Sequence, residues 1–277
     1  MSAGAVRMAA GLALLLAWGC GEDSADALST GGGSTTTGVA VDGGHACEGV
    51  TRSCADVEAS FSASSNVVVD CTDGESTFTF SSSGVPSYDS DQSTPNEVKI
   101  QAWTVTIPLT ATCADTATSV LDSRGEIAFT VAGIPIYGPQ DATGGDAIIN
   151  EGPSMDGCWG HADNNCRYHH HSESPCVFGE NTDLDTQQEA DGHPPLVAYA
   201  LDGFAIYAVD SDDSEGESLD GCNGHTDSLR GYHYHMTTDF PYTIGCYAGA
   251  ATGSSIATAE DNGCETAGAP GGPPPGQ

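Results

Sequence analysis

Short hydrophobic runs, separated by clusters of Gly, Pro, Asn and Ser, fill the middle of the chain. The runs are rich in β-branched and aromatic residues, and in 101–107 an apolar side chain stands at every second position. This spacing predicts strands with one buried face. A longer run, 196–209, is divided by Asp202-Gly203, which predicts two strands joined by a tight turn. The other predicted strands are 66–70, 76–80, 98–108 and 126–131. We find no capped amphipathic segment of helical length, so the pattern predicts a mostly β protein.

The same series of elements occurs twice. An apolar Gly-x-x-Ile-Tyr segment is followed by an Asp-Gly-Cys-x-Gly-His-x-Asp loop, a histidine-rich segment and a cysteine. The loop and the histidine segment are displaced by 64 residues between the copies, and the flanking elements by 70. The matched pairs are 132–137 and 202–207, 155–163 and 219–227, 168–171 and 232–235, and Cys176 and Cys246. We therefore expect a duplicated half-domain, with half-repeats at about 126–179 and 196–249.

The cysteines predict a disulfide framework. The chain has 11 cysteines, and the ten that follow Cys20 form an even set, which in an exported protein indicates disulfides rather than free thiols. If the duplication is structural, equivalent cysteines pair equivalently, which predicts Cys158–Cys176 and Cys222–Cys246. The partners of the other six do not follow from the sequence. We expect an all-β fold, a disulfide-stapled β-sandwich or barrel-like domain with an internal duplication, over 46–265.

The two ends of the chain have different compositions. Residues 1–20 resemble a secretion signal, with Arg7, an apolar run and then Gly19-Cys20, where Cys20 occupies the place of a lipoprotein's acylated cysteine. Ordinary secretion with cleavage nearby is the alternative. Residues 21–45 predict a disordered tether and 266–277 a disordered tail. These features predict an exported protein, either an outer-membrane or cell-surface lipoprotein or a secreted one.

The charge of the chain restricts its partners. The formal net charge is −33 and Lys99 is the only lysine, so we expect no nucleic-acid binding, and membrane contact only through an N-terminal lipid anchor. A solvated exterior accounts for the acid excess. Calcium binding by 210–217 is a sharper alternative, although this segment lacks the glycine that an EF-hand requires at its sixth position.

Each half-repeat carries three histidines at equivalent positions. Residues two apart on a strand project from the same face, so each repeat presents a His-x-His pair, and a loop adds a third imidazole. The ligand candidates are His161, His169, His171, His225, His233 and His235. Imidazole groups suit copper and zinc, and export favours copper. The six histidines are expected to converge on one pseudo-symmetric site, although the sequence alone does not decide between one site and two.

Other residues near these motifs have alternative roles. Asp163 and Asp227 are candidate ligands, or acceptors that fix an imidazole tautomer. Tyr232 and Tyr234 are expected to wall the site or to offer phenol hydroxyls near the metal. His193 has no counterpart in the other repeat, which favours a surface residue over one that closes the site. The alternatives to a metal site are a structural polar network and direct contacts to a small polar ligand.

The segment 231–249 resembles the signature of the YHYH-domain family, exported proteins named after the tetrapeptide at 232–235. The resemblance extends over about 103–249, and it implies domain identity and export but supplies no reaction. The first repeat departs from the signature because His170 replaces a tyrosine. Ala205 stands where a proline is expected, whereas Pro135 keeps it.

Three functions are compatible with these features. The preferred one is an exported copper- or zinc-binding protein. The second is a metal-dependent oxidase or hydrolase, with Asp163 or Asp227 as general base. The third is a non-catalytic adhesion or carbohydrate-binding module that takes a cell-surface glycan. Its candidate stacking aromatics are Trp159, Tyr168, Tyr232 and Tyr242.

Overall fold

The computed structural model describes residues 47–88, 95–179, 182–210, 219–251, 253, 255–258 and 264. The expected signal segment with Cys20, the tether, the tail and the acidic stretch after Asp210 lie outside these residues. Among the described residues, no helix is both long enough and apolar enough to cross a membrane.

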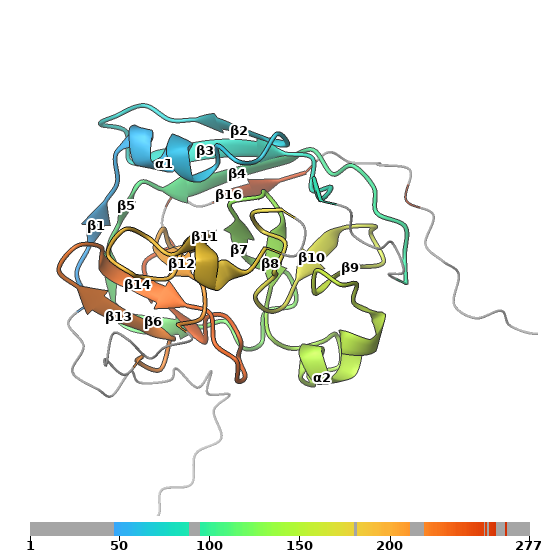
Figure 1. Cartoon of the computed structure of the whole chain (residues 1–277). Helices are drawn as coiled ribbons and strands as arrows, with labels where there is room; N and C mark the ends of the chain where they lie inside the picture. The colour runs from blue at the N-terminus through green and yellow to red at the C-terminus, as the bar shows by residue number, and fades with distance from the viewer. Residues whose placement is uncertain are drawn as a thin grey trace, which may run out of the picture. The chain divides into compact units, whose positions relative to one another are not determined.

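One large sheet contains both half-repeats (Figure 1). The first half supplies β7 (Glu126–Thr130), β8 (Pro135–Tyr137), β9 (Gly160–Ala162) and β10 (Tyr168–His170). The second half supplies β11 (Leu196–Ala200), β12 (Ala205–Tyr207), β13 (Gly224–Asp227) and β14 (Gly231–His235). The strand order is β13-β14-β12-β11-β7-β8-β10-β9. Read outward from the central β7–β11 pair, both halves therefore have the same order.

Strand directions confirm that the duplication is structural. The central pair β7–β11 is antiparallel, as are β7–β8 and β11–β12. The pairs β8–β10 and β12–β14 are parallel, and each outer hairpin is antiparallel again. As predicted, the run 196–209 contains two strands, and Gly203 takes the positive φ (95°) that their tight turn requires.

A second sheet packs against the large one. Its strands are β2 (Val67–Asp70), β3 (Thr77–Ser82), β4 (Trp103–Pro108) and β16 (Ser255–Ala257), in the order β16-β4-β3-β2. Phe80 and Trp103 each meet Phe129 of β7 edge-on at 5.6 Å between ring centroids, and Phe78 meets Tyr199 of β11 at 5.5 Å. These contacts make the core two-layered, and the predicted all-β fold is confirmed.

The alternation in β4 has the predicted form, but the strand is shorter than expected. Trp103, Val105 and Ile107 are buried while Thr104 is exposed. The strand begins at Trp103 rather than at 98 because Ala102 has a φ of 48°, which is incompatible with extended backbone.

Small elements complete the fold. Two short pairs are β1 (Val50–Thr51) with β5 (Thr110–Ala111), and β6 (Cys113–Ser119) with β15 (Cys246–Gly249). The helices are α1 (Cys54–Ser60) and α2 (Ala147–Glu151), with 3-10 turns η1 (Gly152–Ser154) and η2 (Leu184–Gln187). The sequence pattern missed α1 because it is only seven residues long, although Ser53 caps it by accepting from the backbone N–H of Asp56.

Five disulfides staple the fold. Cys158 pairs with Cys176 and Cys222 with Cys246, the two pairs that the repeat predicts. The others are Cys47–Cys113, Cys54–Cys71 and Cys166–Cys264. This number of disulfides indicates an oxidising environment.

Candidate metal centres

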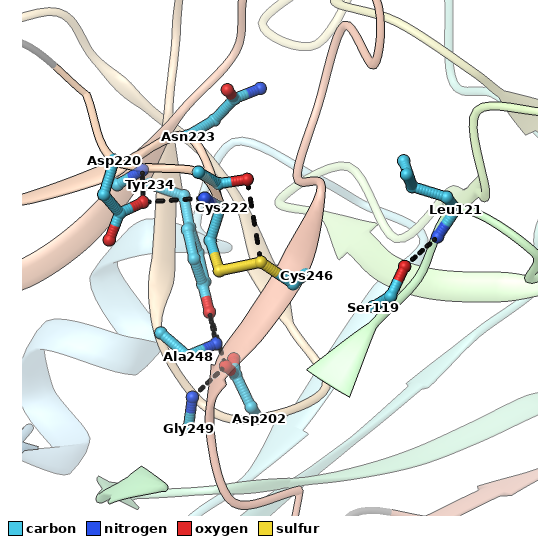
Figure 2. The surroundings of a disulfide bond; sticks show 12 residues. Ser119, Leu121, Asp202, Asp220, Cys222, Asn223, Tyr234, Cys246, Ala248 and Gly249 are labelled. Atoms are coloured by element: carbon cyan, nitrogen blue, oxygen red, sulfur yellow. Dashed lines mark hydrogen bonds between the residues drawn. A yellow bond between two sulfur atoms is a disulfide. The ribbon is translucent and has the colours of Figure 1, made fainter. Parts of the chain in front are cut away.

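An aspartate organises the loop that precedes each histidine segment. In the second repeat, Asp220 accepts the backbone N–H groups of Cys222 (2.8 Å) and Gly224 (3.0 Å), and its other oxygen accepts the Tyr232 hydroxyl (2.8 Å). Figure 2 shows this carboxylate beside the Cys222–Cys246 disulfide. Asp156 of the first repeat makes the same three bonds at 2.9, 3.1 and 2.7 Å. The repeated Asp-Gly-Cys-x-Gly motif is therefore a loop scaffold.

The last glycine of this motif makes room for a tyrosine. A Cβ on Gly224 would lie 2.3 Å from the Tyr232 hydroxyl oxygen, and one on Gly160 equally close to the Tyr168 ring. No larger residue fits there without moving the tyrosine. The histidine that follows each glycine is thereby fixed opposite the first histidine of the His-x-His pair, as the pairing of His225 with His233 shows.

Four histidines converge in the second repeat. Their Nε2 atoms lie 2.9 Å apart for His225 and His233, 3.1 Å for His225 and His235, and 3.2 Å for His193 and His233. All four side chains are buried. One donor atom from each lies within 4.8 Å of every other, which is the spacing of a metal-ligand set.

The tautomers of these imidazoles follow from their other ring nitrogen. The Nδ1 atoms of His193, His233 and His235 lie 2.8, 2.9 and 3.1 Å from the backbone carbonyls of Pro194, Gly231 and Ala208. A carbonyl only accepts, so each Nδ1 carries the hydrogen and donates it. Each Nε2 therefore presents a lone pair to the centre of the cluster.

Three histidines converge in the first repeat. The Nε2 atoms of His169 and His171 are 3.1 Å apart, and their Nδ1 atoms donate to the carbonyls of Arg167 (3.1 Å) and Gly138 (2.7 Å). Nδ1 of His161 lies 3.1 Å from the Ser154 hydroxyl, whose own hydrogen goes to the Glu151 carbonyl. His161 therefore also carries its hydrogen on Nδ1.

A carboxylate borders the first cluster. Glu151 Oε2 lies 3.3 Å from Nε2 of His171 and 3.5 Å from Nε2 of His161. Within the described residues, Nε2 of His161 has no hydrogen-bond partner. The group whose donor atoms all lie within 4.8 Å of one another consists of the three histidines without Glu151. The carboxylate thus stands to one side of the three imidazoles.

Burial favours the uncharged form of His161, His169, His233 and His235. Desolvation, aided by the neighbouring imidazoles, lowers the pKa of His233 to about 3 and that of His235 to about 4. The same causes lower the pKa of His161 and take that of His169 well below its usual value. At neutral pH their lone pairs are therefore free of protons, which is the state that binds metal.

The six predicted ligands lie in two clusters rather than one. The sequence left open whether there is one site or two, and the structure shows two because the halves join through β7 and β11, which leaves β10 and β14 on opposite sides of the sheet centre (Figure 1). They are separated by five strand spacings, about 24 Å along the sheet. Each half-repeat therefore forms its own cluster.

Asp163 and Asp227 are turn residues and not members of either cluster. Asp163 accepts the backbone N–H groups of Asn165 and Arg167, and also the Tyr137 hydroxyl. Asp227 accepts a backbone N–H and the guanidinium of Arg230. Backbone carbonyls and a serine hydroxyl, not these carboxylates, set the tautomers of six clustered imidazoles: His161, His169, His171, His193, His233 and His235.

Tyr232 and Tyr234 face away from the histidines, so the expectation that they wall the site is wrong. Their hydroxyls donate to Asp220 and Asp202, and Figure 2 shows Tyr234 pointing towards Asp202 and Ala248. The alternation of the strand forces this, because neighbouring residues point to opposite faces.

The tyrosines that do border the clusters end the repeated Gly-x-x-Ile-Tyr segment. Tyr137 stacks on His169 with ring centroids 3.9 Å apart. Tyr207 lies edge-on to His193 and His233 at 4.5 and 5.0 Å. Tyr137 and Tyr207 occupy equivalent positions in the two repeats, and this equivalence was the feature of the sequence that indicated a shared role beside the histidines.

Sequence reasoning missed the residue at the fourth side of each cluster. His193 is buried in the second cluster and is not a surface residue. A long-range clamp explains this, because Arg230 binds Glu189 and Asp191 on the loop that carries His193.

The sequence did contain an indication of Glu151. The displacement between matched residues of the two repeats is 70 at residue 137 but 64 at residue 155. The first repeat therefore has six extra residues between these positions, where α2 lies.

The comparisons with known proteins agree with the family resemblance. Residues 104–218 match the sequence model of the family described as YHYH protein. The matched range contains the three histidines of the first cluster and His193, and it ends before the tetrapeptide at 232–235. Neither the curated proteins nor the solved structures include a match.

Proposed function

We propose that this chain is an exported metal-binding protein that holds two transition-metal ions, copper or zinc, one in each half-repeat. The observation that supports this is the convergence of imidazole Nε2 lone pairs in both clusters, with the Nδ1 hydrogens already donated elsewhere. Two such lone pairs face each other at 3.1 Å between His169 and His171 and at 3.2 Å between His193 and His233, and they repel one another unless a cation lies between them.

The spacing supports a metal over a structural hydrogen-bond network. A network needs an N–H donor between each pair of nitrogens, and for the pairs His193–His233 and His169–His171 the backbone carbonyls have taken those hydrogens. A tetrahedral metal bound at 2.0–2.1 Å by imidazole nitrogens separates them by about 3.3–3.4 Å. The observed separations are slightly shorter, so small side-chain movements suffice to accommodate an ion.

The donor set narrows the choice of metal. All seven clustered residues are histidines, which offer nitrogen donors, and every cysteine that the structure describes is in a disulfide. Imidazole without thiolate suits copper and zinc, and copper is favoured by affinity and by the oxidising setting that the disulfides indicate. The N-terminal segment supports export, with Cys20 as the proposed lipid attachment site.

The carbohydrate-binding alternative loses support. Tyr168 and Tyr232 are fully buried and serve the aspartate scaffold, so neither can stack on a sugar. Of the other two candidates, Trp159 is 44% exposed, and Tyr242 is half-buried with its hydroxyl donated to Asp146.

Elemental analysis of the mature, untagged protein after periplasmic expression tests the proposal. We expect about two copper or zinc ions per chain, one ion after His233→Ala/His235→Ala, one after His169→Ala/His171→Ala, and none when the two are combined. His170→Gln is the control. His170 is a buried neighbour bonded to Tyr88 and to the Trp159 carbonyl, on the other face of its strand, so this variant keeps both ions.

Folding is checked for each variant by circular dichroism and by counting free thiols. A folded wild-type protein that takes up neither copper nor zinc on incubation would refute the proposal. Uptake that is indifferent to both double substitutions would refute the assignment of the sites.

A further inference from the structure

The two clusters differ at the position of a fourth ligand. In the second cluster His193 fills it, with Nε2 3.2 Å from that of His233. In the first cluster no fourth imidazole is present within the described part of the chain, and the Glu151 carboxylate stands beside the three histidines instead. The duplication makes this a matched comparison, because the six repeated histidines occupy equivalent positions in the two half-repeats.

The cluster without a fourth histidine is also the one whose histidines line a cavity more completely. All three histidines of the first cluster line a cavity of about 600 Å³, together with Glu151 and Tyr137. A cavity of similar size, about 660 Å³, lies beside the second cluster, and of its four histidines only His233 lines that cavity. Arg230 clamps the loop of His193 over that cluster through Glu189 and Asp191. The first cluster thus faces with all its histidines a space that holds a small molecule, whereas in the second cluster His193 fills the fourth position.

Glu151 is placed to contact a molecule in the open position. Its Oε2 lies at hydrogen-bond range of the region between His161 and His171, and its side chain is 31% exposed towards the cavity. It ends α2, and the Ser154 hydroxyl that orients His161 is bonded to its backbone carbonyl. The carboxylate can accept a hydrogen from a ligand bound at the fourth position, and it repels an anion there.

We propose that the first-repeat cluster is an open metal site that binds a small neutral ligand, water in its resting state, through the metal, while Glu151 accepts a hydrogen from that ligand. The second-repeat cluster takes no added ligand. This inference rests on the proposed metal binding. A three-histidine metal with an open position is the arrangement that activates water in metalloenzymes. It therefore favours the hydrolase alternative, with Glu151 in place of Asp163 or Asp227.

Cobalt(II) reports the two sites separately, because its visible spectrum changes when its ligands change. The full mature chain is loaded with cobalt and titrated with imidazole, a neutral ligand with an N–H to donate, and with azide, an anion without a hydrogen. In His233→Ala/His235→Ala, which keeps the first site, we expect a saturable change with imidazole. In His169→Ala/His171→Ala, which keeps the second, we expect none. If a double variant does not fold, the same titration is made on the wild-type protein with two cobalt ions. We then expect the spectrum of one of the two ions to change with imidazole.

Glu151→Gln tests the role of the carboxylate. The substitution keeps a carbonyl acceptor and removes the negative charge, so imidazole affinity stays within about twofold while azide binds roughly tenfold more tightly. Cobalt affinity is retained, because Glu151 is not one of the ligands. Glu58→Gln, which removes an exposed charge on α1, is the control and leaves both affinities unchanged.

Each contrary result has a distinct meaning. Absence of cobalt from every folded form refutes the metal-binding proposal itself. Bound cobalt at the first site that ignores imidazole refutes the open position, and so does a response of the second site. Loss of cobalt in Glu151→Gln makes Glu151 a ligand and refutes its role as acceptor.

Discussion

Asp156 and Asp220 show how one residue type fixes both candidate sites. Each uses one carboxylate oxygen for two backbone N–H groups and the other for a tyrosine hydroxyl. The tyrosine is buried on the face opposite the histidines, so the same side chain shapes the loop and anchors the strand that carries the His-x-His pair. The two half-repeats therefore share this hydrogen-bond pattern as well as the sequence motif.

Replacing either aspartate leaves three polar groups without their acceptor. We expect Asp220→Ala and Asp156→Ala each to lower the free energy of unfolding by about 2–4 kcal/mol. Urea denaturation measures this through the midpoint, and Asp122→Ala, at an exposed position, is the control with little effect. A large cost for one aspartate and none for the other would contradict the structural equivalence of the loops.

At the scale of elements, the loop between the half-repeats decides the composition of the second cluster. It follows η2 and places His193 just before β11. Arg230, in the turn between β13 and β14, donates to Glu189 (2.8 Å) and to Asp191 on this loop. Asp191 also accepts the backbone N–H of His193. A contact across 40 residues thus converts a loop histidine into a buried one.

Arg230→Gln removes this clamp and frees the loop. We expect the second site to lose about 10–100-fold in metal affinity, the usual cost of losing a group that positions a ligand. The first site is the internal control, because no Arg230 contact reaches its histidines. Competition titration with a chelator, in the His169→Ala/His171→Ala and His233→Ala/His235→Ala backgrounds, separates the two affinities. Equal losses at both sites would show a general destabilisation instead.

At the scale of the whole molecule, two clusters of imidazoles are buried in a chain of net charge −33. Burial disfavours the charged form of several histidines in and beside these clusters, and their pKa values show the consequence. His235 and His170 have pKa values lowered to about 4, and His233 to about 3, each by burial first of all. In the unfolded chain the same groups titrate near 6.5.

The stability of the metal-free protein should therefore fall with acidification. Below pH 6.5 the unfolded state gains protons that the folded state does not, so the free energy of unfolding drops from pH 7 to 5 and further until the folded pKa values are reached. Guanidinium denaturation of chelator-treated protein measures this. In His233→Ala/His235→Ala the slope is shallower. A midpoint that is flat or rises on going from pH 7 to 5 would contradict the prediction.

The sequence by itself determined the features that depend on local periodicity and on the repeat. Alternation of side chains placed His169 with His171 and His233 with His235, and equivalence of the copies paired Cys158 with Cys176 and Cys222 with Cys246. Only the tertiary structure decided that there are two clusters, and which residue completes each. These outcomes depend on the β7–β11 pairing and on the Arg230 clamp, which join segments far apart in the chain. Period-two spacing tells which face a side chain occupies, and it carries no information about what lies opposite that face.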